Sequence, residues 1–117
     1  MRKTDKKIDK QLRFFLTEVC ETALEEYAGF EWLTHVVNYS HFPNSLRVVC
    51  VFDTNENLEN FMIDNHHQAL NAFVQKKLVD IGINIKNFGD HISYDTEENC
   101  DKCDDGRWAV RLKKSCN

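Results

Sequence analysis

The sequence predicts an α+β fold of two layers, in which helices cover one face of an antiparallel or mixed sheet. Three observations predict it. A long segment with helical spacing opens the chain, two segments rich in β-branched and aromatic residues follow, and a second helical region precedes shorter alternating segments. The expected order of elements is α-β-β-α-α-β-β. Because the chain of 117 residues contains no repeat or linker, we expect a single domain over residues 1–117.

The first helix is expected from the fourth or fifth residue to Ala28, with Gly29 as its C-terminal cap. Apolar residues recur in steps of three and four from Ile8 to Tyr27. The opposite face is basic in its first half and acidic in its second half. This order opposes the helix macrodipole and costs up to about 1 kcal/mol. A binding role for the basic half would explain why the order is tolerated.

A β-hairpin is expected after this helix. Residues 32–39 and 46–52 are rich in β-branched and aromatic side chains, and residues 40–45 ("SHFPNS") separate them. Both faces of the second segment are apolar in the middle, since Val49 and Val51 alternate with other apolar residues. We therefore expect this segment to be a central strand.

A second helical region is expected to begin at Asp53 or Thr54, where a capping box can form. It should break or kink at residues 65–67 and continue to Gly82, a natural cap.

The rest of the chain predicts short strands. Residues 83–85 and 92–94 alternate between apolar and polar side chains. The Asp-Gly pair at 105–106 is a strong turn signal, and "RWAVRL" at 107–112 is expected to form a last strand. We expect the last few residues to be frayed.

The net charge of −4 conceals an uneven distribution. Residues 1–13 carry +4, residues 14–106 carry −12 and residues 107–117 carry +4. An acidic body repels nucleic acid, so binding to nucleic acid would have to use the termini.

Our first functional hypothesis is therefore an accessory or regulatory protein associated with nucleic acid or ribonucleoprotein. The basic side chains would contact phosphates, and Trp108 would stack on a base. The candidate residues are Arg2, Lys3, Lys6, Lys7, Lys10 and Arg13 at one end and Arg107, Trp108, Arg111, Lys113 and Lys114 at the other. In the competing interpretation the basic ends only keep the chain soluble, and Trp108 packs in the core.

The second hypothesis is a protein-interaction or homodimeric module without nucleic-acid contact. It would use an edge strand or a sheet face, because both faces of the strand at 46–52 are apolar.

The C-x-x-C pair Cys100 and Cys103 suggests a third hypothesis, a zinc-stabilised domain. Two cysteines at this spacing supply half of a zinc knuckle, and no second pair lies nearby. The acidic residues around them disfavour the thiolate that a redox pair needs. We expect two exposed thiols in an acidic loop, and neither zinc nor another cofactor.

Neither a nucleophile elbow nor a nucleotide-binding motif is present, so we expect no enzymatic activity. No apolar run approaches the roughly 20 residues that span a bilayer, and the basic N-terminal segment precedes no signal-like apolar stretch, so no membrane association is expected. Five scattered cysteines do not form a disulfide framework, which favours the cytoplasm.

Three segments, "MRKTDKKIDKQL", "SLRVVCVFDTNE" and "ISYDTEENC", resemble a small gammaproteobacterial family whose members are often labelled Fis-type transcriptional regulators. The resemblance covers most of the chain and implies a bacterial protein with a regulatory role. Fis proteins are all-helical dimers with a C-terminal helix-turn-helix, whereas a strand is expected at 107–112 here. The resemblance therefore assigns no functional residue.

The element order α-β-β-α-α-β also resembles the type II KH layout of ribosome-binding factor A. KH domains clamp nucleic acid with a GXXG loop between two helices. The corresponding junction here, "IDNHHQA", contains no glycine.

Overall fold

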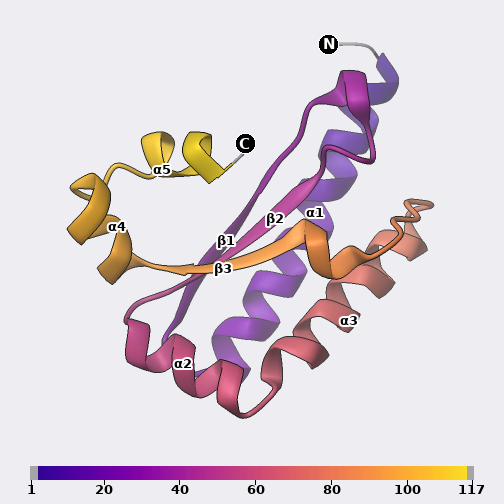
Figure 1. Ribbon diagram of the computed structural model, residues 1–117. Coiled ribbons are helices and arrows are strands. Elements are labelled where there is room, and N and C mark those ends of the chain that lie inside the picture. The colour runs from indigo at the N-terminus through magenta and orange to yellow at the C-terminus, as the bar shows by residue number, and fades with distance from the viewer. Residues whose placement is uncertain (1–2, 116–117) are drawn as a thin grey trace.

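The computed structural model describes the backbone of residues 3–115 and the side chains of residues 3–113 (Figure 1). It confirms the α+β class, with five α-helices and three strands in this part of the chain. The elements in order are α1 (Lys3–Glu26), β1 (Phe30–Val36), β2 (Arg47–Phe52), α2 (Asn55–Ile63), α3 (His66–Asp80), β3 (Ile92–Thr96), α4 (Glu97–Asp104) and α5 (Trp108–Ser115). Short 3-10 helices at Tyr39–His41 and Phe88–His91 lie in the connections.

The sheet is mixed and has the order β1-β2-β3. β1 and β2 are antiparallel, and β2 and β3 are parallel. The expectation that residues 46–52 form a central strand is confirmed. β1 begins at Phe30, two residues before the expected start, and its first pairs are offset by an irregularity between Phe30 and Trp32.

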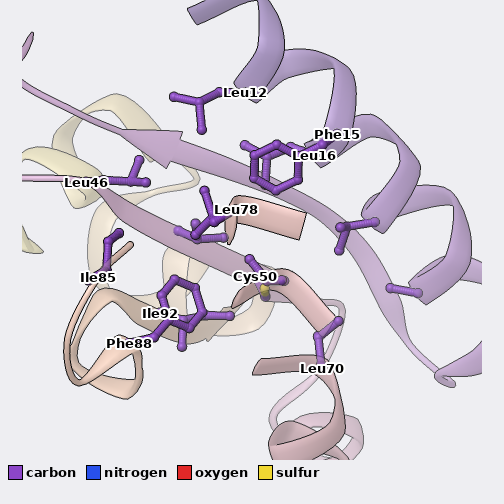
Figure 2. Close-up of a cluster of buried hydrophobic side chains, with 14 of the residues drawn as sticks. Leu12, Phe15, Leu16, Leu46, Cys50, Leu70, Leu78, Ile85, Phe88 and Ile92 are labelled. Carbon is purple, nitrogen blue, oxygen red and sulfur yellow. The ribbon is translucent and has the colours of Figure 1, made fainter. Parts of the chain in front are cut away.

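The main core lies between one face of the sheet and the helices α1, α2 and α3 (Figure 1). Val48, Cys50 and Phe52 of β2 point into it because alternate residues of a strand share a face. Figure 2 shows the side chains that meet there: Leu12, Phe15 and Leu16 of α1, Leu70 and Leu78 of α3, Cys50 of β2 and Ile92 of β3. The apolar residues whose spacing predicted α1 thus form its buried face.

Helices also cover the other face of the sheet, which the sequence did not predict. Val49 and Val51 point to this second face and are 3% and 0% exposed. Trp32 and Asp95, the register partners of Val51 in β1 and β3, both contact side chains of α5. The helical pair α4–α5 therefore lies across the sheet from α1 (Figure 1).

The predicted last strand is wrong, because residues 108–115 form helix α5. The steps from Trp108 to Arg111 and Leu112 place these half-buried side chains on one helical side, whereas Ala109 and Val110 are exposed. In isolation this short segment is compatible with either structure. Contact with the sheet selects the helix.

Two further local expectations differ from the structure. Residues 83–85 contribute the buried Ile83 and Ile85 to the core but form no strand. The expected acidic loop is helix α4, which begins at the N-cap Thr96, whose hydroxyl accepts a hydrogen bond from the amide of Asn99. Glu97 and Glu98 in its first turn favour a helix through the macrodipole.

The expected break between the second and third helices is confirmed. Thr54 is the N-cap of α2, and α2 ends at Ile63 with Asp64 as its C-cap. Asn65 follows in the left-handed conformation with φ of 61° and starts α3.

Candidate functional site

Four lysines form one exposed face in the first half of α1. Steps of three, one and three residues place them on the same side of a 3.6-residue helix. We call Lys3, Lys6, Lys7 and Lys10 the lysine stripe. All four are exposed, and none forms an ion pair with another residue of the described part of the chain. The only acid in the first turn of this helix is Asp5.

Arg13 lies on the same side of α1 but is partly engaged. Its Nε is 2.9 Å from Asp9 Oδ2, an i,i+4 ion pair. Asp9 Oδ1 also accepts a 2.8 Å hydrogen bond from the hydroxyl of Tyr39, and His35 Nε2 lies 3.7 Å away. Burial lowers the pKa of His35 and outweighs the carboxylate of Asp9, which acts in the opposite direction. This polar cluster joins α1 to the hairpin, and the largely exposed Arg13 contacts it through one surface ion pair.

The polar cluster brings no nucleophile to the histidine. Cys20 lines the same groove between α1 and β1 as His35, a groove of about 570 Å³. However, Cys20 lies about 16 Å beyond Asp9 along the axis of α1, as the helical rise requires. A cysteine and a histidine must be within hydrogen-bond distance to act together. Because His35 Nε2 lies 3.7 Å from Asp9 Oδ1, this spacing along α1 leaves Cys20 too far from Nε2 for such a pair.

Phe14 extends the lysine stripe by one helical turn beyond Lys10. Its side chain is 71% exposed. It lies at the side of a groove of about 910 Å³ between α1 and the end of α3. Residues that line this groove include Lys10, Arg13 and Glu18 of α1 and Lys77, Asp80 and Ile81 from the end of α3.

Phe14 was not among the candidate residues predicted from the sequence. The signal was present, since Phe14 and Phe15 are adjacent and only one of them can fit the buried spacing that runs from Leu12 to Val19. Phe15 is 3% exposed and fits it.

Two candidate residues at the C-terminal end are engaged inside the molecule. The rings of Trp108 and Trp32 meet edge to face with centroids 4.8 Å apart. Both indole N–H groups donate to Glu97 Oε1, at 3.2 Å from Trp108 and 2.6 Å from Trp32. This contact agrees with the packing interpretation of Trp108.

Arg111 forms two ion pairs with residues that approach it from different elements. Its Nε and Nη2 donate to the carboxylate of Asp95 at 2.5 and 3.0 Å, and its Nη1 donates to Asp104 Oδ2 at 3.1 Å. These carboxylates raise the pKa of Arg111. Asp104 itself is 4% exposed. The guanidinium therefore neutralises a buried acid and fastens α5 to β3.

The other C-terminal candidates lie across the sheet from the lysine stripe. Arg107 and Lys113 are exposed, and Arg107 Nη2 is 3.8 Å from Asp105 Oδ2. Arg107 directly precedes α5 and Lys113 lies in it, so these cations and the lysine stripe belong to segments on opposite sides of the sheet (Figure 1). Arg2 and the side chain of Lys114 lie outside the described residues.

The C-x-x-C pair lies on α4 rather than in a loop. Cys100 is 0% exposed and Cys103 is exposed. Burial raises the pKa of the Cys100 thiol. Among residues 3–113, no group of three or more histidine, cysteine or acidic side chains is arranged to hold a metal ion. Cys100 follows the buried Thr96 by one helical turn, and this places it on the packed side of α4.

Comparisons of the chain with protein-family models, with curated proteins and with solved structures find no significant match. Within the described residues, no helix combines the length and the apolar character that crossing a membrane requires.

Proposed function

We propose that the protein is a non-enzymatic accessory protein of the cytoplasm that binds nucleic acid through the lysine stripe of α1. The supporting observation is that four lysines share one exposed face and have no acidic partner among the described residues. Four cysteines of the described chain, Cys20, Cys50, Cys100 and Cys103, are free thiols, which agrees with a reducing compartment.

The lysine stripe destabilises the helix that carries it. Cations near a helix N-terminus oppose the macrodipole, typically by 0.3–1 kcal/mol each at low salt. Neighbouring lysines three or four residues apart also repel one another by about 0.2–0.5 kcal/mol. A polyanion bound along the stripe removes both costs, because phosphate oxygens are favourable at a helix N-terminus.

Most acidic residues also lie outside the first half of α1, which carries the stripe. Most acidic residues belong to the second half of α1, to α2 and to α4. A phosphate backbone that approaches the N-terminal half of α1 therefore meets a locally positive surface although the net charge is −4.

The salt dependence of binding tests this proposal. The affinity for a labelled oligonucleotide, measured by fluorescence anisotropy, should fall with salt with a log–log slope of about −3 to −4, because four phosphates are neutralised. The triple variant Lys6→Gln/Lys7→Gln/Lys10→Gln should reduce the slope to about −1.

The matched control carries the same change in net charge elsewhere. Lys76, Lys86 and Lys102 are exposed, lie outside α1 and are not candidate contacts, so their triple replacement by glutamine should leave the slope within experimental error. The absence of binding by the natural chain at low salt, or equal losses in both triple variants, would contradict the proposal.

The alternative, a protein-interaction or homodimeric module, now depends on the edge strand β1. The second face of β2 is covered within the chain, since Val49 and Val51 are buried. β1 is an outer strand of the sheet and contains no proline or lysine between Phe30 and Val36. Light scattering distinguishes this candidate, because strand pairing between two copies doubles the mass.

A further inference from the structure

We propose that Phe14 and the groove between α1 and α3 hold a base of single-stranded nucleic acid whose backbone lies along the lysine stripe. This inference rests on the proposed function and specifies its ligand as an unpaired strand.

The position of Phe14 links an aromatic ring directly to the cations. Phe14 follows Lys10 by four residues, which is about 6 Å along the helix axis and keeps it on the same side. A phenylalanine that is 71% exposed contributes little to the core, and its neighbour Phe15 already fills the buried position. An exposed aromatic ring beside basic side chains is the arrangement that stacks bases and tracks the backbone of a single strand.

The groove beside Phe14 provides space for the base. Its volume is about 910 Å³. Its far wall is the end of α3, where Ile81 offers an apolar contact. Lys77 on the same wall has its Nζ 3.3 Å from Glu18 Oε2 and 5.7 Å from the centre of the Phe73 ring, so the cation is held within the wall.

The charges of the groove favour a base over a phosphate. Glu18, Glu21 and Asp80 line it together with Lys10, Arg13 and Lys77. Since the three carboxylates balance the three cations, the groove offers a phosphate no net attraction, whereas the lysine stripe does. A neutral base is not repelled, and carboxylate oxygens accept hydrogen bonds from exocyclic amino groups. The backbone is therefore confined to the lysine stripe and the base to the groove.

This geometry selects single strands over duplexes. Bases in a duplex are stacked and paired, and they reach a protein pocket only after they are unpaired at a cost of a few kcal/mol in other systems. An unpaired strand presents its bases without that cost and can stack one on an aromatic side chain.

An abasic oligonucleotide separates the stacking contact from the phosphate contacts. The natural chain is titrated with a deoxythymidine oligomer of about 12 nucleotides, within the site sizes typical of single-strand binders. The same titration is made with an abasic oligomer of equal length, with the duplex and with a uridine oligomer. The variant Phe14→Ala is compared with Leu24→Ala, which removes another exposed apolar side chain of α1, 51% exposed.

We expect the natural chain to bind the deoxythymidine or uridine oligomer more tightly than the abasic oligomer and the duplex. Phe14→Ala should weaken binding to that oligomer about 5- to 150-fold, the range of base stacking on an aromatic residue. It should leave the abasic affinity and the salt slope unchanged, and Leu24→Ala should change neither. Circular dichroism identical to that of the natural chain establishes that Phe14→Ala is folded.

Equal affinity for abasic oligomers and oligomers with bases would overturn this inference and leave the proposed function standing. So would preference for the duplex, or an unchanged affinity in Phe14→Ala. A change of oligomeric state caused by Phe14→Ala, measured by light scattering, would also overturn it. The groove would then hold a second copy of the chain. If none of these oligonucleotides binds with a salt-dependent affinity, the proposed function itself fails.

Discussion

At the scale of single residues, Arg111 connects three elements of the fold. It contacts Asp95 on the sheet and Asp104 at the end of α4, and the side chain of Asp104 is 3% exposed. A buried carboxylate is tolerated when a cation and hydrogen bonds compensate its desolvation. Arg111 therefore serves the fold, although the sequence alone placed it among candidate phosphate contacts.

We expect Arg111→Ala to lower the free energy of unfolding by about 2–3 kcal/mol, because Asp104 loses its cation and α5 loses its tie to β3. Arg107→Ala is the matched control. Its side chain is 66% exposed, its Nη2 lies 3.8 Å from an exposed acid and its Nε donates a 3.3 Å hydrogen bond to the Asp104 carbonyl, so the loss should stay below about 1 kcal/mol. Urea denaturation monitored by circular dichroism measures both. Equal losses in the two variants would show that Arg111 does not fasten α5.

Prediction of single residues from the sequence was limited where a side chain contacts a partner that is distant along the chain. The lysine stripe could be predicted, since helical spacing alone places Lys3, Lys6, Lys7 and Lys10 on one exposed face. The partners of Arg111 and Trp108 could not, because Asp95 and Trp32 reach them only after the chain has folded across the sheet. Side chains with local determinants were predictable, and those with distant partners were not.

At the scale of elements, the helices and strands with long apolar patterns were predicted correctly, whereas the short helices α4 and α5 were not. α1 spans 24 residues and β2 has buried residues at five consecutive positions, so their signals exceed local ambiguity. α4 and α5 have eight residues each. Isolated helices this short are marginal in water, and packing decides their structure. For α5 that packing is against the second face of the sheet, whereas α4 also has local helix signals in Thr96, Glu97 and Glu98.

The turn between α1 and β1 gives an element-scale prediction. Gly29 has φ of +82°, and a Cβ atom there would lie 2.5 Å from Asp53 Oδ1 and 2.6 Å from Asn57 Cβ. Asp53 is fixed in this position, because its amide donates to the Gly29 carbonyl at 2.8 Å and its side chain accepts from Asn57 at 2.8 Å. Gly29→Ala must therefore displace the beginning of α2.

We expect Gly29→Ala to cost about 2–4 kcal/mol, the sum of left-handed strain and overpacking. Gly82→Ala supplies the control for strain alone, since Gly82 has φ of +84° and no atom within 4 Å of the added Cβ. It should cost about 1–2 kcal/mol. Chemical denaturation of the two variants side by side gives the difference. If Gly82→Ala costs as much as Gly29→Ala, the close packing at Asp53 contributes nothing.

At the scale of the whole molecule, the sheet separates two functions. The face under α1, α2 and α3 contains the main core, and the outer side of α1 carries the lysine stripe and Phe14. The opposite face is closed by α4 and α5 through Trp108 and Arg111. The first face thus supports the proposed binding surface, and the second is sealed by the chain's own C-terminal helices.

This arrangement predicts how the chain unfolds. Both tryptophans, Trp32 and Trp108, lie on the second face, so tryptophan fluorescence follows the packing of α4 and α5 against the sheet. Far-ultraviolet circular dichroism follows mainly the long helices α1 and α3. If residues 1–117 form one cooperative domain, the two signals should give coincident urea transitions. We expect coincidence, because the buried Val49 and Val51 belong to the same strand as the core residues Val48 and Cys50, and one face cannot lose its cover without weakening the other. A fluorescence transition at lower urea than the dichroism transition would show that α4 and α5 open as a separate unit.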